Sequence, residues 1–151
     1  MLVGVPRENY PGERRVALVP SVLPLLANVG LEVGIEQGAG ISAGFPDVAY
    51  IDHGARIFSD RSKLFSSSQI LLRVRNPDKN GISTASTDVD SYNSNQLLIG
   101  LLDPLGSPEL AANLASQGTT SFALELLPRI SRAQSMDALT AMATVAGYKS
   151  V

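Results

Sequence analysis

The chain of 151 residues has the length of one domain, and a domain of this size buries roughly 70% of its unfolded surface. Its 44% apolar and 17% charged residues exclude a wholly disordered protein, and its net charge of −2 argues against a general nucleic-acid-binding protein. With no cysteine and one histidine, disulfides and cysteine-ligated zinc are excluded, and no metal site is expected.

The chain begins with a strand, a helix and a second strand. Residues 2–5 form an apolar run typical of a buried parallel strand. Ser21 can cap a helix whose apolar face spans 22–29, and Gly30 is placed to end it. The alternating run 31–36 is predicted as the second strand.

A short helix and two further strands are predicted next. Asp47 can cap a helix that ends before Gly54, and residues 55–58 are predicted as a strand. The apolar run 69–74 is predicted as another strand. Residues 75–92 are polar and rich in Asn, Ser, Asp and Thr, which indicates a long surface connection.

The following elements are a strand, a helix and a last strand. Residues 96–101 have a strand pattern. Ser107, followed by proline and glutamate, is typical of a helix start, and that helix is predicted to run to Ser116 before Gly118. Residues 119–123 are predicted as the last strand.

The end of the chain has helical spacing from Ser135 and no stop signal before Val151. The alternation of strands and helices predicts an α/β fold, a mostly parallel sheet with helices on both faces, as in Rossmann and flavodoxin-like lobes. We expect residues 1–134 to form this lobe. Residues 135–151 are expected to begin a long helix that leads toward a further lobe.

No segment is predicted to cross a membrane. The longest uncharged run, Val16–Leu31, contains Pro20 and Pro24 and is too short for a hydrocarbon core of ~30 Å. The N-terminus lacks the basic and apolar regions of a signal peptide. We therefore expect a soluble, unprocessed chain without direct membrane insertion.

A glycine-rich turn follows the second predicted strand. Gly38, Gly40 and Gly44 stand where a dinucleotide-binding loop could be, but the third glycine comes one residue late and Pro46 lies just beyond. We therefore favour a tight structural loop over a phosphate site.

Arginines supply nine of the twelve basic residues, and most follow predicted strands. The carboxyl ends of parallel strands meet at one edge of a sheet, where arginines could hold a carboxylate or phosphate. A charged rim, or ion pairs with Glu8 and Glu13 in the first loop, would give the same pattern. The arginines in question are Arg7, Arg14, Arg15, Arg73, Arg75, Arg129 and Arg132.

The segment 128–139 has the densest set of polar groups suited to binding. Arg129 and Arg132 could hold an anion near the N-terminus of the last helix, and Gln134 and Asp137 could bond to a sugar hydroxyl or an amide. The alternative is a helix cap, with Ser131 or Ser135 as the capping residue and Asp137 in the first turn. Local chemistry leaves both interpretations open.

Several stretches resemble a known family. Residues 3–8, 13–20 and 36–40 resemble the N-terminal domain shared by alanine dehydrogenases and nicotinamide nucleotide transhydrogenases. The segment 128–139, followed by Ala-Gly-Tyr at 146–148, resembles the transhydrogenase alpha subunit specifically. The resemblance covers essentially the whole chain.

The resemblance implies hydride transfer between NAD(H) and NADP(H), coupled to proton movement. It implies that NAD(H) lies in a cleft between two Rossmann-like lobes, and that this first lobe supplies a loop beside the nicotinamide. By motif position the cofactor-binding residues are Arg129, Gln134, Asp137 and Thr140. Gln134 and Asp137 are the candidate catalytic residues, with orienting rather than acid–base roles.

The resemblance also implies partners and a location. NADP(H) would be bound by a partner subunit or domain, beside membrane-embedded transhydrogenase components, and the parent protein is expected to be a homodimer. The location implied is cytoplasmic, peripheral to the inner membrane through these partners. No nucleic-acid partner is expected.

Two alternatives to this function are retained. An amino-acid dehydrogenase could use Arg15 for a substrate carboxylate, but the lysine and histidine of alanine dehydrogenases are matched here by Arg75 and Asp103. A lobe without catalysis could serve as a partner-binding module. The glycine-rich nucleotide loop of the family belongs to the second lobe, so this sequence is expected to carry half of the nucleotide site.

Overall fold

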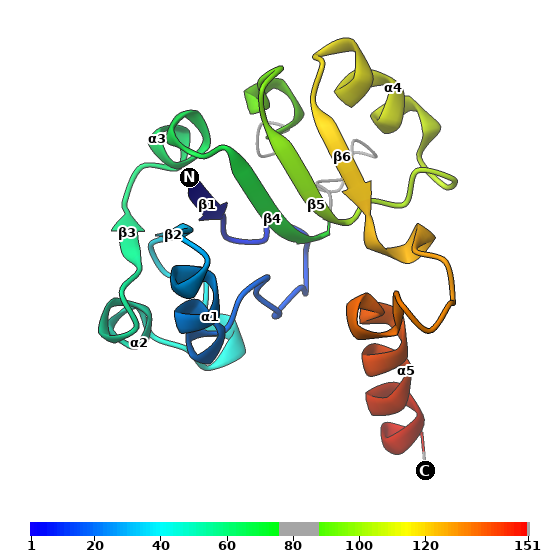
Figure 1. Cartoon of the computed structure of the whole chain (residues 1–151), viewed down its shortest axis with the longest axis horizontal. Helices are drawn as coiled ribbons and strands as arrows, with labels where there is room; N and C mark the ends of the chain where they lie inside the picture. The colour runs from blue at the N-terminus through cyan, green and yellow to red at the C-terminus, as the bar shows by residue number, and fades with distance from the viewer. Residues whose placement is uncertain (76–87, 151) are drawn as a thin grey trace.

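The computed structural model describes residues 1–75 and 88–150 and contains a six-stranded, all-parallel sheet (Figure 1). The strand order is β3-β2-β1-β4-β5-β6, so the direction of winding reverses between β1 and β4. This order is that of a Rossmann-type doubly wound fold. The strands are β1 (Leu2–Val5), β2 (Glu32–Glu36), β3 (Arg56–Phe58), β4 (Ile70–Arg75), β5 (Leu97–Leu101) and β6 (Thr120–Ala123).

The predicted α/β class and all six strands are confirmed, with strand ends within one residue of the expected positions. The inner strands of a parallel sheet are covered on both faces, so their sequences are apolar runs bounded by turns, and such runs are easily recognised. Leu71 and Leu72 show the alternation of faces. Leu71 belongs to one core cluster, whereas Leu72 packs against the other.

The helices divide between the two faces of the sheet. Leu23 and Tyr50 place α1 and α2 on one face, while Phe65 and Leu110 place α3 and α4 on the other. The α-helices are α1 (Leu23–Asn28), α2 (Asp47–Asp52), α3 (Arg61–Ser67), α4 (Pro108–Ser116) and α5 (Ala138–Lys149). Short 3-10 turns are η1 (Pro20–Val22), η2 (Ile41–Ala43), η3 (Asp88–Ser91), η4 (Leu124–Leu126) and η5 (Gln134–Met136).

The predicted capping residues are mostly wrong. Ser21 lies within η1, and its side chain caps neither η1 nor α1. Pro46 is the N-cap of α2, and the Asp47 carboxylate instead accepts the Gly38 N–H at 2.9 Å. Ser107 does occupy the N-cap of α4, but its hydroxyl makes no capping bond. For Asp47, a backbone N–H outside the helix takes the place of the expected capping donors.

Helix α3 was not expected from the sequence. Its N-cap is Asp60, whose carboxylate accepts the N–H groups of Ser62 and Lys63 at 2.9 and 3.4 Å. The helix is only seven residues long and rich in serine, so its helical pattern is weak. The capping aspartate was the signal that could have revealed it.

The glycine-rich turn packs tightly against α2. A Cβ on Gly40 would lie 2.6 Å from the Phe45 carbonyl oxygen and 2.6 Å from the Tyr50 ring. Tyr50 is fully buried, and its hydroxyl donates to the Leu18 carbonyl oxygen at 3.0 Å. These contacts fit the structural role that the spacing of the glycines predicts.

Gly40→Ala is expected to destabilise the protein by about 1–3 kcal/mol, because neither the carbonyl nor the buried ring can give way freely. Urea unfolding followed by circular dichroism measures this loss. Gly147→Ala is the matched control, because nothing lies within 4 Å of a Cβ at that helical position. Equal stability of the two variants would contradict the packing argument.

Helix α5 extends from the sheet toward the C-terminus and is mostly exposed (Figure 1). It begins at Ala138, three residues later than the sequence pattern indicates, because 134–136 forms the separate turn η5. Its Ala138 and Met142 help to line an apolar pocket of 380 Å³ over β4 and β5. Within the described ranges, no helix combines the length and apolar character needed to span a bilayer.

Candidate functional site

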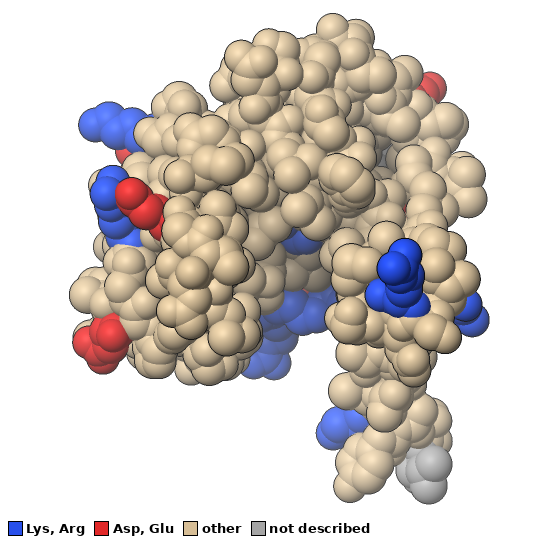
Figure 2. Space-filling model, in the orientation of Figure 1, with Lys and Arg blue, Asp and Glu red and all other residues tan. Residues whose placement is uncertain are grey.

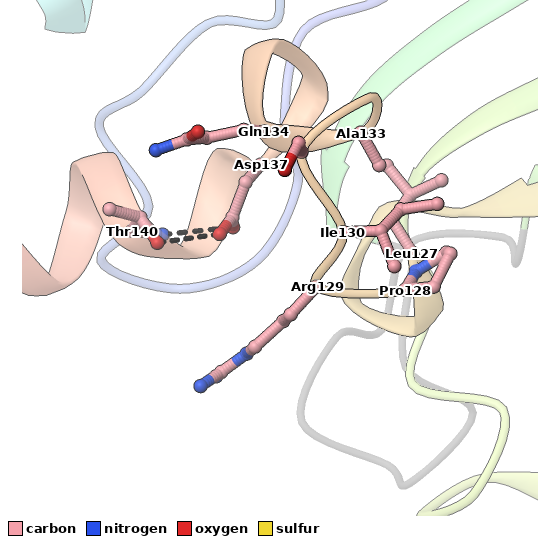
Figure 3. Close-up of a pocket in the computed structure, with 9 residues that line it drawn as sticks. Leu127, Pro128, Arg129, Ile130, Ala133, Gln134, Asp137 and Thr140 are labelled. Atoms are coloured by element: carbon pink, nitrogen blue, oxygen red, sulfur yellow. Dashed lines mark hydrogen bonds between the residues drawn. The ribbon is translucent and has the colours of Figure 1, made fainter.

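The polar loop between β6 and α5 encloses a pocket of 340 Å³. All four predicted cofactor-binding residues line it, together with apolar side chains of the same loop. Figure 3 shows the polar ends of Arg129, Gln134 and Thr140 directed to one side, with Leu127 and Ile130 on the other. The lining residues are Leu127, Pro128, Arg129, Ile130, Ser131, Ala133, Gln134, Asp137 and Thr140.

Asp137 is the N-cap of α5. Its Oδ1 accepts the N–H groups of Leu139 and Thr140, each at 3.0 Å, and its Oδ2 accepts the Thr140 hydroxyl at 2.5 Å. The Thr140 hydroxyl, aided by the backbone donors, lowers the pKa of Asp137. The loop therefore does contain a helix cap, as the alternative interpretation of this segment expected. The capping residue, however, is Asp137 and not Ser131 or Ser135.

Capping fixes Asp137 at the edge of the pocket as an anion. Arg129 and Gln134 are exposed, and their side chains make no hydrogen bond to any other described residue. Ala133, between them, is buried and anchors the loop. The loop thus offers a guanidinium, an amide and a carboxylate around one apolar-backed opening. This set suits a ligand with a flat ring, hydroxyls and an anionic part.

A second cluster of charged residues fills the point where the winding of the sheet reverses. Glu8, just after β1, accepts the Val74 N–H at 2.7 Å and lies 3.7 Å from Nη2 of Arg73. Asp88 accepts Nη1 of Arg73 at 2.8 Å and Nη2 of Arg61 at 2.5 Å. Open α/β sheets often bind ligands at this point, but here the chain's own ion pairs occupy it.

Burial and ion pairing compete in this cluster. Burial alone would lower the pKa of the Arg73 guanidinium, but Tyr92, Glu8 and Asp88 raise it. Burial raises the pKa of Asp88, yet the two arginines outweigh it and hold that pKa below its usual value. The arginines and Asp88 are therefore charged at neutral pH and hold one another inside the protein.

The arginines do not all converge on an anion-binding edge as the sequence suggested. Arg73 has no exposed side-chain surface, because its position in β4 directs it into the core beside Tyr92. Arg75 is exposed and stacks over the Tyr10 ring at 4.1 Å. The connection predicted over 75–92 was also only partly a surface segment. Its end at Asp88 and Tyr92 is buried, and residues 76–87 lie outside the described part of the chain.

Arg15 is held by an ion pair with Glu13. This agrees with the expectation that the arginines of the first loop could form local ion pairs rather than an anion site. Its Nε and Nη2 donate to the two carboxylate oxygens of Glu13 at 2.7 and 2.5 Å. Its Nη1 lies 2.6 Å from the Met142 sulfur. This arginine therefore links the first loop to α5. Asp103 lies elsewhere, after β5, with a positive φ of 48°.

The Glu13–Arg15 pair gives a testable pH dependence. The Arg15 side chain lowers the pKa of Glu13 from 4.5 to about 2. A lowered carboxyl pKa stabilises the fold above the unfolded value, and this contribution is lost as pH falls from 4.5 to 2. We expect Glu13→Gln to flatten the fall in unfolding free energy across that range. Because Arg15 is 46% exposed, the effect is small.

Urea unfolding of the wild type and Glu13→Gln at several pH values measures this effect. The difference between the two curves removes the contribution of the other carboxyl groups. An unchanged difference between pH 5 and pH 2.5 would show that the pair does not stabilise the fold.

Sequence reasoning missed the Glu8, Arg61, Arg73 and Asp88 cluster. The available signal was a charged residue, Arg73, inside an otherwise apolar strand. Arg73 requires a buried partner, and that partner comes from Asp88, fifteen residues along the chain. The intervening segment gives no periodic pattern by which to place it.

Relatives of this chain include enzymes of two kinds. It is 38% identical over its whole length to the NAD(P) transhydrogenase subunit alpha of Cereibacter sphaeroides, of which it covers 28%. It is 33% identical to the same subunit of Haemophilus influenzae, covering 28%, and 31% identical to the alanine dehydrogenase of Bacillus subtilis, covering 36%. The chain thus spans between about a quarter and two fifths of these relatives.

Solved structures agree with these sequence comparisons. The transhydrogenase of Sinorhizobium meliloti superposes with a TM-score of 0.88 at 35% identity, over 98% of this chain and 42% of that one. An L-alanine dehydrogenase superposes with a TM-score of 0.74 at 33% identity, over 83% of this chain and 32% of that one. Residues 4–146 match the family model described as alanine dehydrogenase/PNT, N-terminal domain, and the chain therefore belongs to that family.

Proposed function

We propose that this lobe is part of a proton-translocating NAD(P) transhydrogenase alpha subunit, where it holds the nicotinamide side of NAD(H). The supporting observation is that Arg129, Gln134, Asp137 and Thr140 line one pocket between β6 and α5. Relatives over the whole chain include transhydrogenase alpha subunits. The pocket of 340 Å³ lies at the small end of the range of ligand pockets, roughly 300–1,000 Å³.

The polar side chains that line the pocket suit the nicotinamide side of NAD(H). Arg129 can pair with a nucleotide anion, and Gln134 can donate to and accept from the carboxamide or ribose. Leu127 and Ile130 give an apolar backing against which a ring can lie. Asp137, already bonded to its own helix, acts chiefly by fixing the loop.

The bound nucleotides supply the hydride chemistry, so the residues of this chain need not exchange protons. Their task is orientation, because hydride transfer requires two rings held in contact. Gln134 and Asp137 would serve this purpose at the nicotinamide end. Helix α5 would lead toward a second lobe that supplies most of the nucleotide contacts.

The transhydrogenase proposal is favoured over an amino-acid dehydrogenase by two positions. Arg75 and Asp103 stand where the resemblance places a lysine and a histidine in alanine dehydrogenases. Arg75 stacks on Tyr10, and Asp103 is a carboxylate that would repel a substrate carboxylate. The partners proposed are an NADP(H)-binding component and membrane-embedded subunits. The location proposed is the cytoplasmic side of the inner membrane.

Titration with NADH tests the division of the site between two lobes. The 151-residue chain is expected to bind NADH weakly, with a dissociation constant above about 1 mM, because its pocket makes few contacts. A chimera that replaces the matching segment of the Cereibacter sphaeroides subunit by this chain is expected to bind much more tightly. Nucleotide fluorescence measures both affinities.

The chimera also separates the alternatives. Hydride exchange from NADPH to an NAD⁺ analogue, measured with the partner subunits added, supports the transhydrogenase function. Oxidation of alanine by the chimera would favour the dehydrogenase. Tight NADH binding by the 151-residue chain alone would contradict the half-site proposal.

A further inference from the structure

We propose that Arg15 is a positioning residue, which holds helix α5 in place through Met142 and so keeps the loop of the candidate site oriented. The observation behind this is a side-chain contact between the first loop and the last helix, 127 positions apart in the chain. The docking of α5 can be tested without any nucleotide. Its effect on hydride exchange rests on the proposed function.

Beyond its first turn, helix α5 has a single partly buried side chain. From Thr140 to Ser150, every residue except Met142 is exposed. Figure 2 shows the C-terminal part of the helix projecting from the body of the molecule. A helix of twelve residues is marginal in water by itself, so α5 depends on tertiary contacts to stay folded. Met142 is therefore a main point of attachment for the helix.

The Met142 side chain lies over the carboxyl ends of β4 and β5. It lines the apolar pocket of 380 Å³ together with Val16 and Ala17 of the first loop and Leu124 of η4. A flexible, unbranched thioether adapts to an irregular apolar surface of this kind. Its burial draws α5 toward the first loop. The open volume of the pocket leaves the helix room to shift unless a further contact fixes it.

Arg15 supplies this fixing contact, and Glu13 holds Arg15 in the required orientation. Nε and Nη2 of Arg15 donate to Glu13, which leaves Nη1 directed at the Met142 sulfur, 2.6 Å away. The Glu13 carboxylate also accepts the backbone N–H groups of Arg14 and Arg15 at 3.1 and 3.0 Å. Only 6% of the Glu13 side-chain surface is exposed. A planar guanidinium that is held on one side presents its remaining donors in a fixed direction.

The direction of α5 matters because the helix begins inside the candidate site. Asp137, its N-cap, and Thr140, in its first turn, both line the pocket of 340 Å³. Met142 lies about 7.5 Å further along the helix than Asp137. A helix moves as a unit over such a short distance, so a shift at Met142 displaces both lining residues. The orientation of reacting groups is sensitive to displacements of about 1 Å.

This role differs from that of an arginine that binds a substrate carboxylate. The two oxygens of Glu13 already take the Nε and Nη2 donors of Arg15, which form one face of the guanidinium. A carboxylate ligand would have to displace Glu13 to bind in the same bidentate way. In this chain the arginine is therefore committed to contacts within the protein.

Amide hydrogen exchange of the 151-residue chain, followed by NMR, tests the docking of α5. A short helix that leaves the surface unfolds and exchanges, so the amides at 145–149 report docking. We expect Arg15→Ala to speed their exchange about fivefold, and Met142→Ala to speed it at least as much. The amides of β1 should be unaffected. Arg14→Ala is the matched control, because Arg14 is exposed and its side chain makes no hydrogen bond to any described residue.

A double variant shows whether Arg15 acts through Met142. If it does, Arg15→Ala/Met142→Ala exchanges no faster at 145–149 than Met142→Ala alone, because the contact is already lost. If Arg15 instead stabilises the first loop independently of α5, the two increases multiply. Increases that multiply, or unchanged exchange in Arg15→Ala, would overturn the proposal.

Hydride exchange in the chimera tests the link between α5 and the nucleotide. Arg15→Ala is expected to lower the rate at saturating nucleotide about tenfold and to change the dissociation constant of NADH by less than about twofold, because positioning acts on the reaction more than on binding. Arg14→Ala should change neither. An unaltered rate in Arg15→Ala, despite faster amide exchange, would overturn the link between the helix and the loop.

The two measurements also separate this inference from the proposed function. A chimera that is inactive with the unaltered lobe contradicts the transhydrogenase function. Amide exchange in the 151-residue chain still decides in that case whether Arg15 docks the helix. Faster exchange in both single variants, without a further increase in the double variant, supports the positioning role.

Discussion

Asp88→Ala is expected to destabilise the protein by about 3–5 kcal/mol, because the buried Arg73 and the partly exposed Arg61 lose their shared carboxylate. Among the described residues, Arg73 would retain only the Tyr92 hydroxyl at 3.4 Å and Glu8 at 3.7 Å. A loss of this size is a large fraction of the stability of an ordinary domain, about 5–15 kcal/mol. Urea unfolding followed by circular dichroism measures it.

The control for this variant is Asp52→Ala. Asp52 lies at the exposed end of α2, so its loss is expected to change stability by less than about 0.5 kcal/mol. The double variant Arg73→Met/Asp88→Ala should be more stable than Asp88→Ala alone, because the unpaired charge of Arg73 no longer stays buried. Equal stability of Asp88→Ala and Asp52→Ala would refute the role of the cluster.

Asp137→Ala is expected to lower hydride exchange in the chimera about 100-fold, because the loss of the cap releases the loop that carries Gln134. The proposed role of the loop is to orient the nicotinamide. Displacing the loop should lower the rate of hydride exchange more than it lowers the stability of the protein. Loss of an N-cap typically costs only ~1 kcal/mol of stability. Stopped-flow measurement with saturating nucleotides gives the rate.

Asp137→Asn separates the cap from the charge. Asparagine caps helices about as well as aspartate, so this variant should keep the helix and the position of the loop. A rate near wild type would assign Asp137 a positioning role, whereas a loss as large as that in Asp137→Ala would assign its charge a direct role. An unaltered rate in Asp137→Ala itself would contradict the proposed site.

The parallel sheet was predictable because its signal is local. Each buried strand must be apolar over four to six residues, as in Leu2–Val5 and Leu97–Leu101, and each run is bounded by polar or glycine-containing turns. Gly30 and Gly118, both with positive φ, also mark helix ends in a way that sequence alone predicts. Helix starts were less predictable, since Asp47 found a partner outside its own helix.

The candidate site was partly predictable for the same reason. Arg129, Gln134 and Asp137 lie within nine positions of one another, so any compact loop brings them near, and the motif there resembles a known one. The bond between Asp137 and Thr140 follows from helix geometry, but the choice of Asp137 over Ser135 as the cap did not. That choice depends on how the loop turns at η5.

By itself, the sequence determined the class of the fold and the positions of the strands. It also indicated that the polar side chains between β6 and α5 lie close together. All three features depend on residues that are neighbours along the chain. Only the tertiary structure decided that Arg73 lies inside the protein and pairs with Asp88 and Glu8. Such pairings join segments far apart in sequence, and a buried charge is stable only where the fold brings its partner.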